Sequence, residues 1–320
     1  MAAKDKLKPK SVDEAPPSAP APQADQDDAP TEHGEEQAAS ALSPPVPDAD
    51  PAPEPEAASE PAPEPVGEAE PTPEPPPASE PIRHTHEGVP YLALLSAIHR
   101  QLRPSVYLEI GSHTGDSLRL ASCASIAVDP KFKITSDVIG EKPALHLFQE
   151  TSDRFFASGA ADRIAPAGVD MAFLDGLHLF EYLLRDFINT EKLCHWRSAV
   201  LLHDCLPPNT EISEREYRPH LRSDEMWRIY WTGDVWKLIP ILQRFRPDLH
   251  LTLFDAPPSG LVMVTGLDPA NRVLERAYSR ILAEYRDFVL NEESFHRFYA
   301  NATLTSSRAV FEGTALGAFV

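Results

Sequence analysis

The chain has 320 residues and a formal net charge of −20, which is concentrated near one end. Residues 1–80 hold 20 of the 34 prolines, nineteen acidic residues against four lysines, and no Trp, Tyr or Phe. Such a segment cannot bury enough apolar surface to offset its ordering entropy. We therefore expect a disordered Pro/Ala/Glu-rich tail over 1–82 and one folded domain over 83–320, with C-terminal helices over 270–320.

The balanced charge of the folded part excludes some classes of partner. Residues 83–320 have no basic stripe of the kind that binds nucleic acid, so no nucleic-acid partner is expected. No apolar run reaches the length of a membrane span, so no membrane partner is expected either.

Three imperfect decapeptides end the tail, beginning at Pro51, Pro61 and Pro71 with the pattern Pro-x-Pro-Glu-Pro. Alternating proline favours polyproline II, and like charges extend it, so this segment is typical of a semi-stiff spacer. Two interpretations stay open: a docking segment for a protein partner, and a solubilising extension with no specific partner.

The folded part alternates between helices and short apolar strands. The first half predicts a helix over 88–102, a strand over 106–110, a helix over 116–124, strands over 125–129 and 145–148, and a helix around Phe155 and Phe156. The second half predicts a strand over 169–174, a helix over 179–193, a strand over 199–202, a helix over 235–245, a hairpin of strands over 249–254 and 261–265, and a helix over 272–291. This order predicts an α/β fold: a doubly wound, Rossmann-like seven-stranded sheet with a C-terminal antiparallel hairpin.

The cysteines indicate the compartment. Cys123, Cys194 and Cys205 form no close pair and match no zinc-site spacing. An odd number of separated cysteines is typical of reduced thiols, so we expect a cytoplasmic protein. A homo-oligomer is left open.

The first strand runs into a glycine turn, Glu109-Ile-Gly111-Ser112-His-Thr-Gly115, and the second strand ends at Asp129. Glycines allow a ligand to approach the backbone, and a later acid can accept hydrogen bonds from ribose hydroxyls. The middle glycine of a dinucleotide site is absent, which favours a ribose ligand without a pyrophosphate, S-adenosylmethionine (SAM) above all. The alternative is an ordinary strand-to-helix turn.

Two further strands end in polar groups: Asp175-Gly-Leu-His178 follows one, and His203-Asp204 follows the next. Strand ends of a parallel sheet meet at one edge, so these groups can converge, and two carboxylates suit a hard cation. His178, with an ordinary pKa near 6.5, would be mostly neutral at pH 7 and able to accept a proton. Alternatively, Asp175 caps a helix, His178 is a surface residue and Asp204 holds a loop.

The segment 206–234 interrupts the alternation and contains Trp227, Tyr230 and Trp231. Long segments at the binding edge of such a sheet are often functional, and aromatic side chains suit stacking on a sugar or planar molecule. We expect either a lid over an acceptor site or aromatic packing of this segment on the core.

Together these residues resemble the class I SAM-dependent methyltransferases over about 88–268. The groups at 175–178 and 203–204 are similar to a narrower branch, the metal-dependent sugar O-methyltransferases and cephalosporin-hydroxylase-like proteins. The block Trp231-Thr-Gly-Asp-Val-Trp-Lys237, with Arg246-Pro-Asp-Leu249, resembles a bacterial family of that branch.

The resemblance implies SAM as cofactor. Glu109, Gly111 and Gly115, with Ser112 between them, would surround its methionine part. Asp129 would hold the ribose hydroxyls. Near the adenine would lie Thr151 and Ser152.

The resemblance also implies catalysis by Asp175 and His178, with His178 as base. A divalent metal (Mg, Mn or Fe) would be bound by Asp175 and Asp204, with His203 added in this chain. His203 stands where the branch carries an acid, which shifts the preferred ion from magnesium toward manganese, iron or zinc.

Three functions follow as expectations. The first is methylation of a hydroxyl on a small-molecule or glycosidic acceptor. The second is an iron-dependent hydroxylase-like enzyme on the same fold that uses His178, His203 and the carboxylates to hold iron. The third is a non-catalytic binding module that acts through the Pro/Glu tail.

Overall fold

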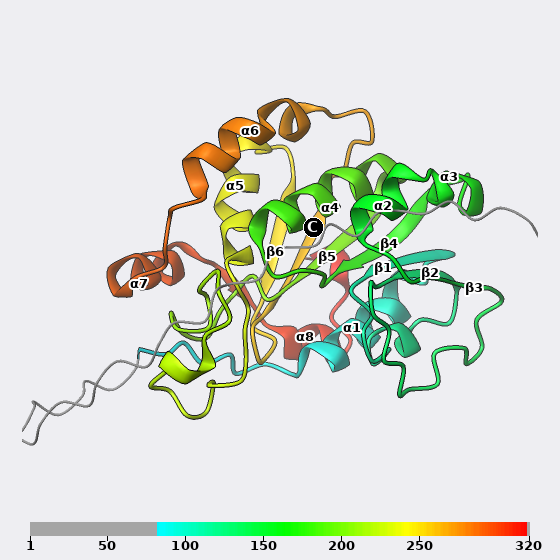
Figure 1. Ribbon diagram of the computed structural model, residues 1–320. Coiled ribbons are helices and arrows are strands. Elements are labelled where there is room, and N and C mark those ends of the chain that lie inside the picture. Colours follow the sequence, from blue (N-terminus) through cyan, green and yellow to red (C-terminus); the bar gives the residue numbers. More distant parts are fainter. Residues whose placement is uncertain (1–81, 319–320) are drawn as a thin grey trace, which may run out of the picture. The chain divides into compact units, whose positions relative to one another are not determined.

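The computed structural model describes residues 82–318, and the predicted tail lies almost wholly outside them. The described residues form one sheet with helices on both faces (Figure 1). The strands are β1 (Val106–Ile110), β2 (Ala124–Val128), β3 (Leu145–Phe148), β4 (Val169–Leu174), β5 (Cys194–His203), β6 (His250–Phe254), β7 (Leu261–Thr265) and β8 (Leu304–Thr305). The helices are α1 (Tyr91–Leu102), α2 (Ser152–Ala157), α3 (Ala160–Ile164), α4 (Phe180–Leu193), α5 (Leu238–Phe245), α6 (Val273–Tyr285), α7 (Glu292–Asn301) and α8 (Ser307–Phe311).

The strand order is β3-β2-β1-β4-β5-β7-β6-β8. Strands β1 to β5 are parallel, and β7 runs antiparallel between β5 and β6. The predicted doubly wound sheet and its hairpin are confirmed. One strand more than predicted is present, because the two-residue β8 pairs with β6 and covers that edge of the sheet.

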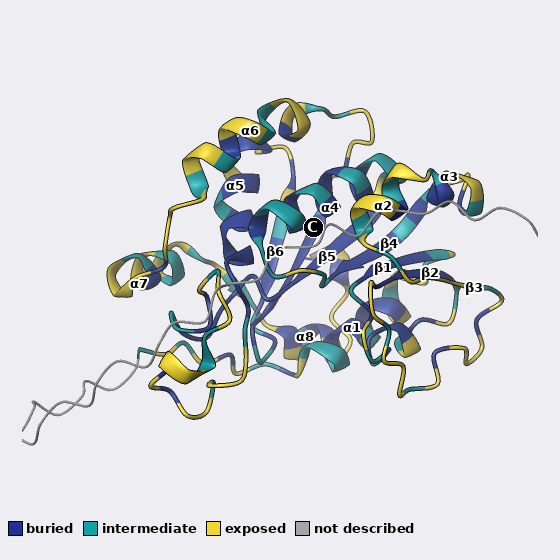
Figure 2. Cartoon of the chain, viewed as in Figure 1, coloured by how far each residue is buried: buried dark blue, intermediate teal, exposed yellow. Residues whose placement is uncertain are grey.

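Two apolar layers hold this arrangement together. Leu108 and Ile110 of β1 face the core under α2, α4 and α5, whereas Tyr107 faces the core with α1. The central strands are therefore buried on both faces, as the dark strands of Figure 2 show, and this explains their nearly continuous apolar sequence. None of the helices in residues 82–318 has the length and apolar character needed to span a membrane.

The predicted helix over 116–124 is wrong: only a short 3-10 turn, Leu118–Leu120, forms there. The polar side chains at its start bond elsewhere. Asp116 accepts hydrogen bonds from Thr114 (2.8 Å) and Ser136 (2.5 Å), and Ser117 donates to Glu109. Such local bonds compete with helix formation.

The predicted helix over 272–291 ends early, at Tyr285, and a separate helix, α7, begins just after the predicted range, at Glu292. Asn291 starts the second helix because its side chain accepts a hydrogen bond from the Ser294 amide at 2.9 Å, which makes it a cap.

Candidate functional site

Two cavities adjoin at the carboxyl edge of the sheet. The larger, of about 730 Å³, lies at the ends of β1, β2 and β4 and beside the starts of α2 and α4. The smaller, of about 350 Å³, lies between the end of β5 and the segment 206–234. The strand order reverses between β1 and β4, where ligands of open α/β sheets bind. Asp175 and His178 line both cavities.

The strand register brings Asp175 and Asp204 together. Leu174 of β4 pairs with Leu202 of β5, so the residues that follow these strands emerge side by side. Asp204 has a left-handed backbone (φ 60°), and its Oδ1 accepts a hydrogen bond from Ser259. This backbone conformation is tolerated by Asp better than by most residues and is common at functional sites.

His178 lies between the two carboxylates. Its Nε2 is 3.3 Å from Asp175 Oδ1 and 3.3 Å from Asp204 Oδ2. Its Nδ1 is 2.6 Å from the Trp231 carbonyl oxygen, which can only accept, so Nδ1 carries a proton and Nε2 faces the carboxylates. This is the arrangement that prepares a histidine to bind a metal through Nε2.

The protonation of His178 differs from the mostly neutral imidazole that we expected from the sequence. Burial favours the uncharged ring, but Asp204, Asp175 and the Trp231 carbonyl outweigh it and raise the pKa of His178 to about 9. Burial alone would raise the pKa of Asp175, yet His203 and His178 hold that pKa well below its usual range. At neutral pH His178 is therefore protonated unless another cation offsets the carboxylates.

Asp175, His178 and Asp204 each offer a ligand atom, and these atoms lie within 4.8 Å of one another. One imidazole and two carboxylates suit a divalent ion such as Mn²⁺ or Fe²⁺. His203 lies outside this group of three, although its Nδ1 is 3.1 Å from Asp175 Oδ1 and 3.4 Å from Asp204 Oδ1. We interpret His203 as a residue that orients the carboxylates, and its role as a ligand stays a prediction.

The block that begins at Trp231 holds His178 in place. Gly233 has a left-handed backbone (φ 58°), and a Cβ there would lie 1.7 Å from the His178 carbonyl oxygen. Only glycine permits this contact between the two backbones, which brings the Trp231 carbonyl to His178. The block that begins at Trp231 thus positions His178.

Four of the predicted cofactor residues line the larger cavity: Gly111, Asp129, Thr151 and Ser152. Asp129 Oδ2 accepts from the His113 amide (2.8 Å), and Oδ1 accepts from the Lys131 amide (2.7 Å). A carboxylate has about four acceptor positions, so two remain for a ligand.

Three predicted residues, Glu109, Ser112 and Gly115, do not line it. Glu109 is fully buried and accepts from Tyr107 Oη (2.6 Å) and Ser117 Oγ (2.9 Å). Burial raises the pKa of Glu109 to about 7, although these two hydroxyls lower it. Its contacts are thus those of a residue that holds the glycine turn.

Sequence reasoning missed two residues of the larger cavity, Tyr182 and Asp186 of α4. They are one helical turn apart and so occupy one face of the helix. Asp186 is only 2% exposed. Burial raises its pKa to about 7, and the hydroxyl of Ser152 offsets only part of that effect. An acid within an amphipathic helix normally indicates a solvent-facing residue, so no sequence pattern marked Asp186 as part of the site.

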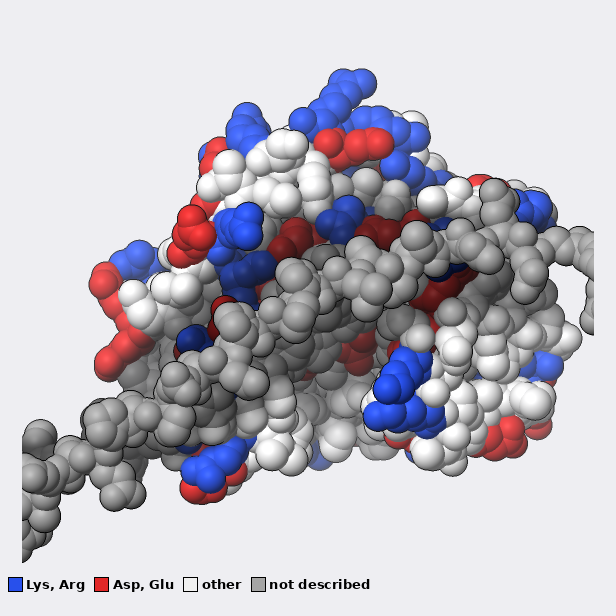
Figure 3. Space-filling model, viewed as in Figure 1, with Lys and Arg blue, Asp and Glu red and all other residues white. Residues whose placement is uncertain are grey.

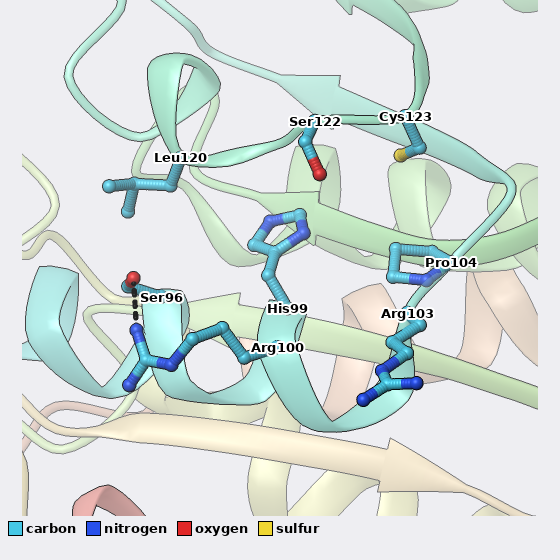
Figure 4. A pocket seen from close by; sticks show the side chains of 8 residues that line it. All are labelled: Ser96, His99, Arg100, Arg103, Pro104, Leu120, Ser122 and Cys123. Carbon is cyan, nitrogen blue, oxygen red and sulfur yellow. Dashed lines mark hydrogen bonds between the residues drawn. The ribbon is translucent and has the colours of Figure 1, made fainter. Parts of the chain in front are cut away.

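A separate cavity of about 560 Å³ lies at the opposite edge, where β1 and β2 begin. The ring of His99 points from α1 toward the segment that carries Leu120 and Ser122, and Arg100 donates to Ser96 Oγ at 2.8 Å (Figure 4). None of the predicted site residues lines this cavity.

No protein-family model matches the chain, and no curated protein matches its sequence. Among solved structures, it is similar to the SAH-bound methyltransferase PaMTH1 of Podospora anserina, with 14% identity over 56% of this chain and 78% of that one and a TM-score of 0.39. It is also similar to the O-methyltransferase TomG of Streptomyces achromogenes, from tomaymycin synthesis, in complex with SAM (14% identity, 56% and 80% covered, TM-score 0.41). An O-methyltransferase of Bacillus cereus with SAH gives 12% identity, 57% and 83% covered, and a TM-score of 0.40. These likenesses are too distant to add to the fold assignment, which rests on the strand order.

Proposed function

We propose that this protein is a SAM-dependent methyltransferase that methylates a hydroxyl of a small molecule or sugar. The observation that carries the proposal is that Asp175 and His178 line both cavities at the carboxyl edge. A group-transfer enzyme needs two substrate sites that meet at the reacting atoms. Here the larger cavity contains Asp129, an acid suited to ribose hydroxyls, and it adjoins the smaller, aromatic cavity. The two cavities meet at the cluster of Asp175, His178 and Asp204, whose side chains can accept a proton.

The lining of the smaller cavity indicates the acceptor. Trp227, Tyr230 and Trp231 supply aromatic surface, and neither Lys nor Arg is among the described residues that line it. The carboxylates at its floor disfavour an anion. We infer an uncharged acceptor with one or two rings, bound through a hydroxyl at Asp175 and His178.

The reaction forms a bond between the acceptor oxygen and the methyl carbon and breaks the bond from that carbon to sulfur. The electron pair of the broken bond neutralises the sulfonium and gives S-adenosylhomocysteine (SAH). The hydroxyl loses one proton. The protein must align the three atoms and accept that proton.

The cluster offers two ways to remove the proton. If His178 is the base, its Nε2 must be unprotonated, which its pKa of about 9 prevents at neutral pH unless the carboxylates are neutralised. If Asp175, His178 and Asp204 hold a divalent ion, that ion lowers the pKa of the hydroxyl and orients it. The second arrangement fits the distances and the protonated Nδ1 of His178 better, and we favour it.

The iron-dependent hydroxylase-like alternative gains no support from the geometry. It needs His178 and His203 as joint ligands, and His203 lies outside the group of three ligand residues. Iron content with oxygen consumption distinguishes this alternative. The binding-module alternative depends on the tail, which lies outside the described residues.

Calorimetric titration of SAH into the full chain tests the methyl-donor site. We expect one site, with affinity reduced at least about tenfold in Asp129→Asn, because a ribose hydroxyl loses a charged acceptor. Asp137→Asn is the matched control: this acid also accepts from the amides of its own turn (Ile139, 3.1 Å) but lines neither cavity. No binding by the folded wild-type chain would contradict the proposal.

Titration of Mn²⁺, followed by its electron paramagnetic resonance signal, tests the metal arrangement. Asp204→Asn should weaken binding at least about tenfold, because a carboxylate ligand is lost. Asp170→Asn removes an acid that also pairs with a histidine, His195 at 2.9 Å, but at the opposite edge, and should change nothing. Equal affinities of Asp204→Asn and wild type would place the ion elsewhere.

A further inference from the structure

The cavity at the opposite edge of the sheet, where β1 and β2 begin, has a basic and polar lining. Arg100 belongs to the last turn of α1, and Arg103 follows this helix directly. Ser122 and Cys123 line the cavity from the segment that leads into β2. No Asp or Glu is among the described residues that line it, so its charge favours an anion.

The two arginines keep their donors available for a ligand. Both are exposed, and no ion pair within residues 82–318 involves either of them, whereas Arg119, the next arginine in the chain, lies 3.8 Å from Asp116. Arg100 donates to Ser96 Oγ at 2.8 Å, a neutral group one turn earlier in the same helix. The helix dipole favours cations at the end of α1, which explains the position of these side chains but occupies none of their N–H groups. Such N–H groups bind phosphate oxygens in pairs.

A buried histidine forms part of the same wall. His99 is 8% exposed, and its ring lies between the guanidinium groups of Arg100 and Arg103 in the view of Figure 4. Its Nε2 has no hydrogen-bond partner within residues 82–318. Burial and the charge of Lys142 lower the pKa of His99 to about 4, so the ring is neutral at neutral pH. An unpaired buried nitrogen is unfavourable, and a hydrogen bond from a ligand, or from water bound with it, would satisfy this one.

Lys142 adds a third positive charge close to the cavity. It is 9% exposed, and its Nζ donates to the Ala121 carbonyl oxygen at 2.6 Å. Burial lowers the pKa of Lys142, and Cys123, Glu109 and Asp137 offset this only in part. No ion pair within the described part of the chain neutralises Lys142, so an anion in the cavity would stabilise its charge.

We propose that this cavity binds a soluble small molecule with a diphosphate group, which is held by Arg100, Arg103 and the Ser122 hydroxyl. Two phosphates suit two guanidinium groups that lie on either side of one ring. The volume of about 560 Å³ is typical of small-molecule sites and leaves room for the rest of the ligand. This inference is independent of the proposed methyl transfer, because the two cavities of that site lie at the other edge of the sheet.

Calorimetric titration of inorganic pyrophosphate into the full chain, with EDTA present to exclude bound metal, tests the site. We expect one site, with affinity at least about tenfold lower in the double variant Arg100→Gln/Arg103→Gln, because two charge-assisted contacts are lost. Arg100→Lys keeps the charge without the paired N–H groups and should lose less affinity than Arg100→Gln. Arg276→Gln is the matched control, since Arg276 is an exposed arginine of α6 that lines none of these cavities.

Alkylation of Cys123 locates the ligand independently. Cys123 lines the cavity and is partly exposed, whereas Cys194 and Cys205 are buried. Saturating pyrophosphate should slow the reaction of Cys123 with N-ethylmaleimide at least about fivefold in wild type, because the occupied cavity excludes the reagent. The same concentration should give no protection in the double variant. Mass spectrometry of the peptide that contains Cys123 measures both rates.

Three results would overturn the assignment. Equal pyrophosphate affinities of wild type and the double variant would place the anion elsewhere. Binding that leaves the alkylation of Cys123 unchanged would place it outside the cavity. Co-sedimentation of wild type, but not of the double variant, with phosphatidylcholine vesicles that contain a prenyl diphosphate, without binding of free pyrophosphate, would assign the arginines to a lipid headgroup. None of these results bears on SAH binding, so the proposed function stands or fails separately.

Discussion

Single residues set the geometry of the cluster through backbone contacts as much as through side chains. Gly233 contacts the His178 carbonyl, and the Trp231 carbonyl two residues earlier fixes the proton on His178 Nδ1. The Trp231 carbonyl, more than fifty residues later in the chain, therefore determines that Nε2 of His178 faces Asp175 and Asp204.

Gly233→Ala should destabilise the protein by at least about 2 kcal/mol, since a methyl group would overlap backbone at a position that is already left-handed. Gly140→Ala is the control, because Gly140 is also left-handed (φ 47°) but has no atom within 4 Å of its Cβ position. It should cost only about 1 kcal/mol. Urea unfolding measures both, and equal losses would mean that the contact with His178 is not strained.

Glu109 should make stability depend on pH. Its pKa rises from 4.5 to about 7 in the folded protein, so between these values the folded state holds more protons than the unfolded state. Stability therefore falls as pH rises across this window, by up to about 1.4 kcal/mol per pH unit. In Glu109→Gln this contribution is absent. We expect the free energy of unfolding of wild type minus that of the variant to fall between pH 5 and pH 7.5, and a constant difference would contradict this.

At the scale of elements, α4 and the segment 206–234 share one buried network. Asp234 Oδ1 accepts from the Phe180 amide at 2.9 Å and so caps α4 from a distant part of the chain. Asp234 Oδ2 accepts from Arg215 (2.6 Å) and from the fully buried Lys237 (2.8 Å). The network attaches the aromatic wall of the smaller cavity to the helix that carries Tyr182 and Asp186.

Asp234→Asn should cost about 3 kcal/mol or more, because Lys237 would keep its charge without a carboxylate in a buried site. Glu214→Gln breaks the exposed pair with Arg218 (2.9 Å) in the same segment and should cost less than about 1 kcal/mol. Thermal unfolding of both variants measures the difference. Similar losses would show that the network does not hold this segment.

The elements also show what the sequence could and could not predict. Asp175 and Asp204 were predictable because residues that follow buried parallel strands must lie at one edge. The face of the sheet on which the Glu109 side chain lies was not predictable, because a strand buried on both faces lacks the alternation of polar and apolar residues that would indicate it. The burial of Asp186 was not predictable either, because α4 has the ordinary pattern of an amphipathic helix. The predicted helix over 116–124 does not form, because Ser117 donates a hydrogen bond to Glu109 and Asp116 accepts one from Ser136.

At the scale of the whole molecule, residues 1–80 and the folded part differ in net charge. Residues 1–80 account for about −15 of the net −20, whereas side chains of both signs are interspersed on the visible folded surface in Figure 3. Such a charge would repel anions at low salt and hardly affect a ligand of zero net charge.

Deletion of residues 1–81 should therefore leave the calorimetric affinity for SAH, a zwitterion, unchanged at low and at physiological salt. The full chain measured in parallel is the control. A large loss of affinity on deletion would show that the tail takes part in the site and would favour the binding-module interpretation.

The central claim is that the methyl group of SAM lies at the cluster shared by the two cavities. The most direct test is the NMR signal of SAM labelled with ¹³C in its methyl group, bound to the full chain with Mg²⁺ or with Mn²⁺. Paramagnetic Mn²⁺ held by Asp175, His178 and Asp204 should broaden this signal strongly, and Asp204→Asn should abolish the effect. A sharp methyl signal with Mn²⁺ bound would contradict the claim, because the methyl group would then lie far from the cluster.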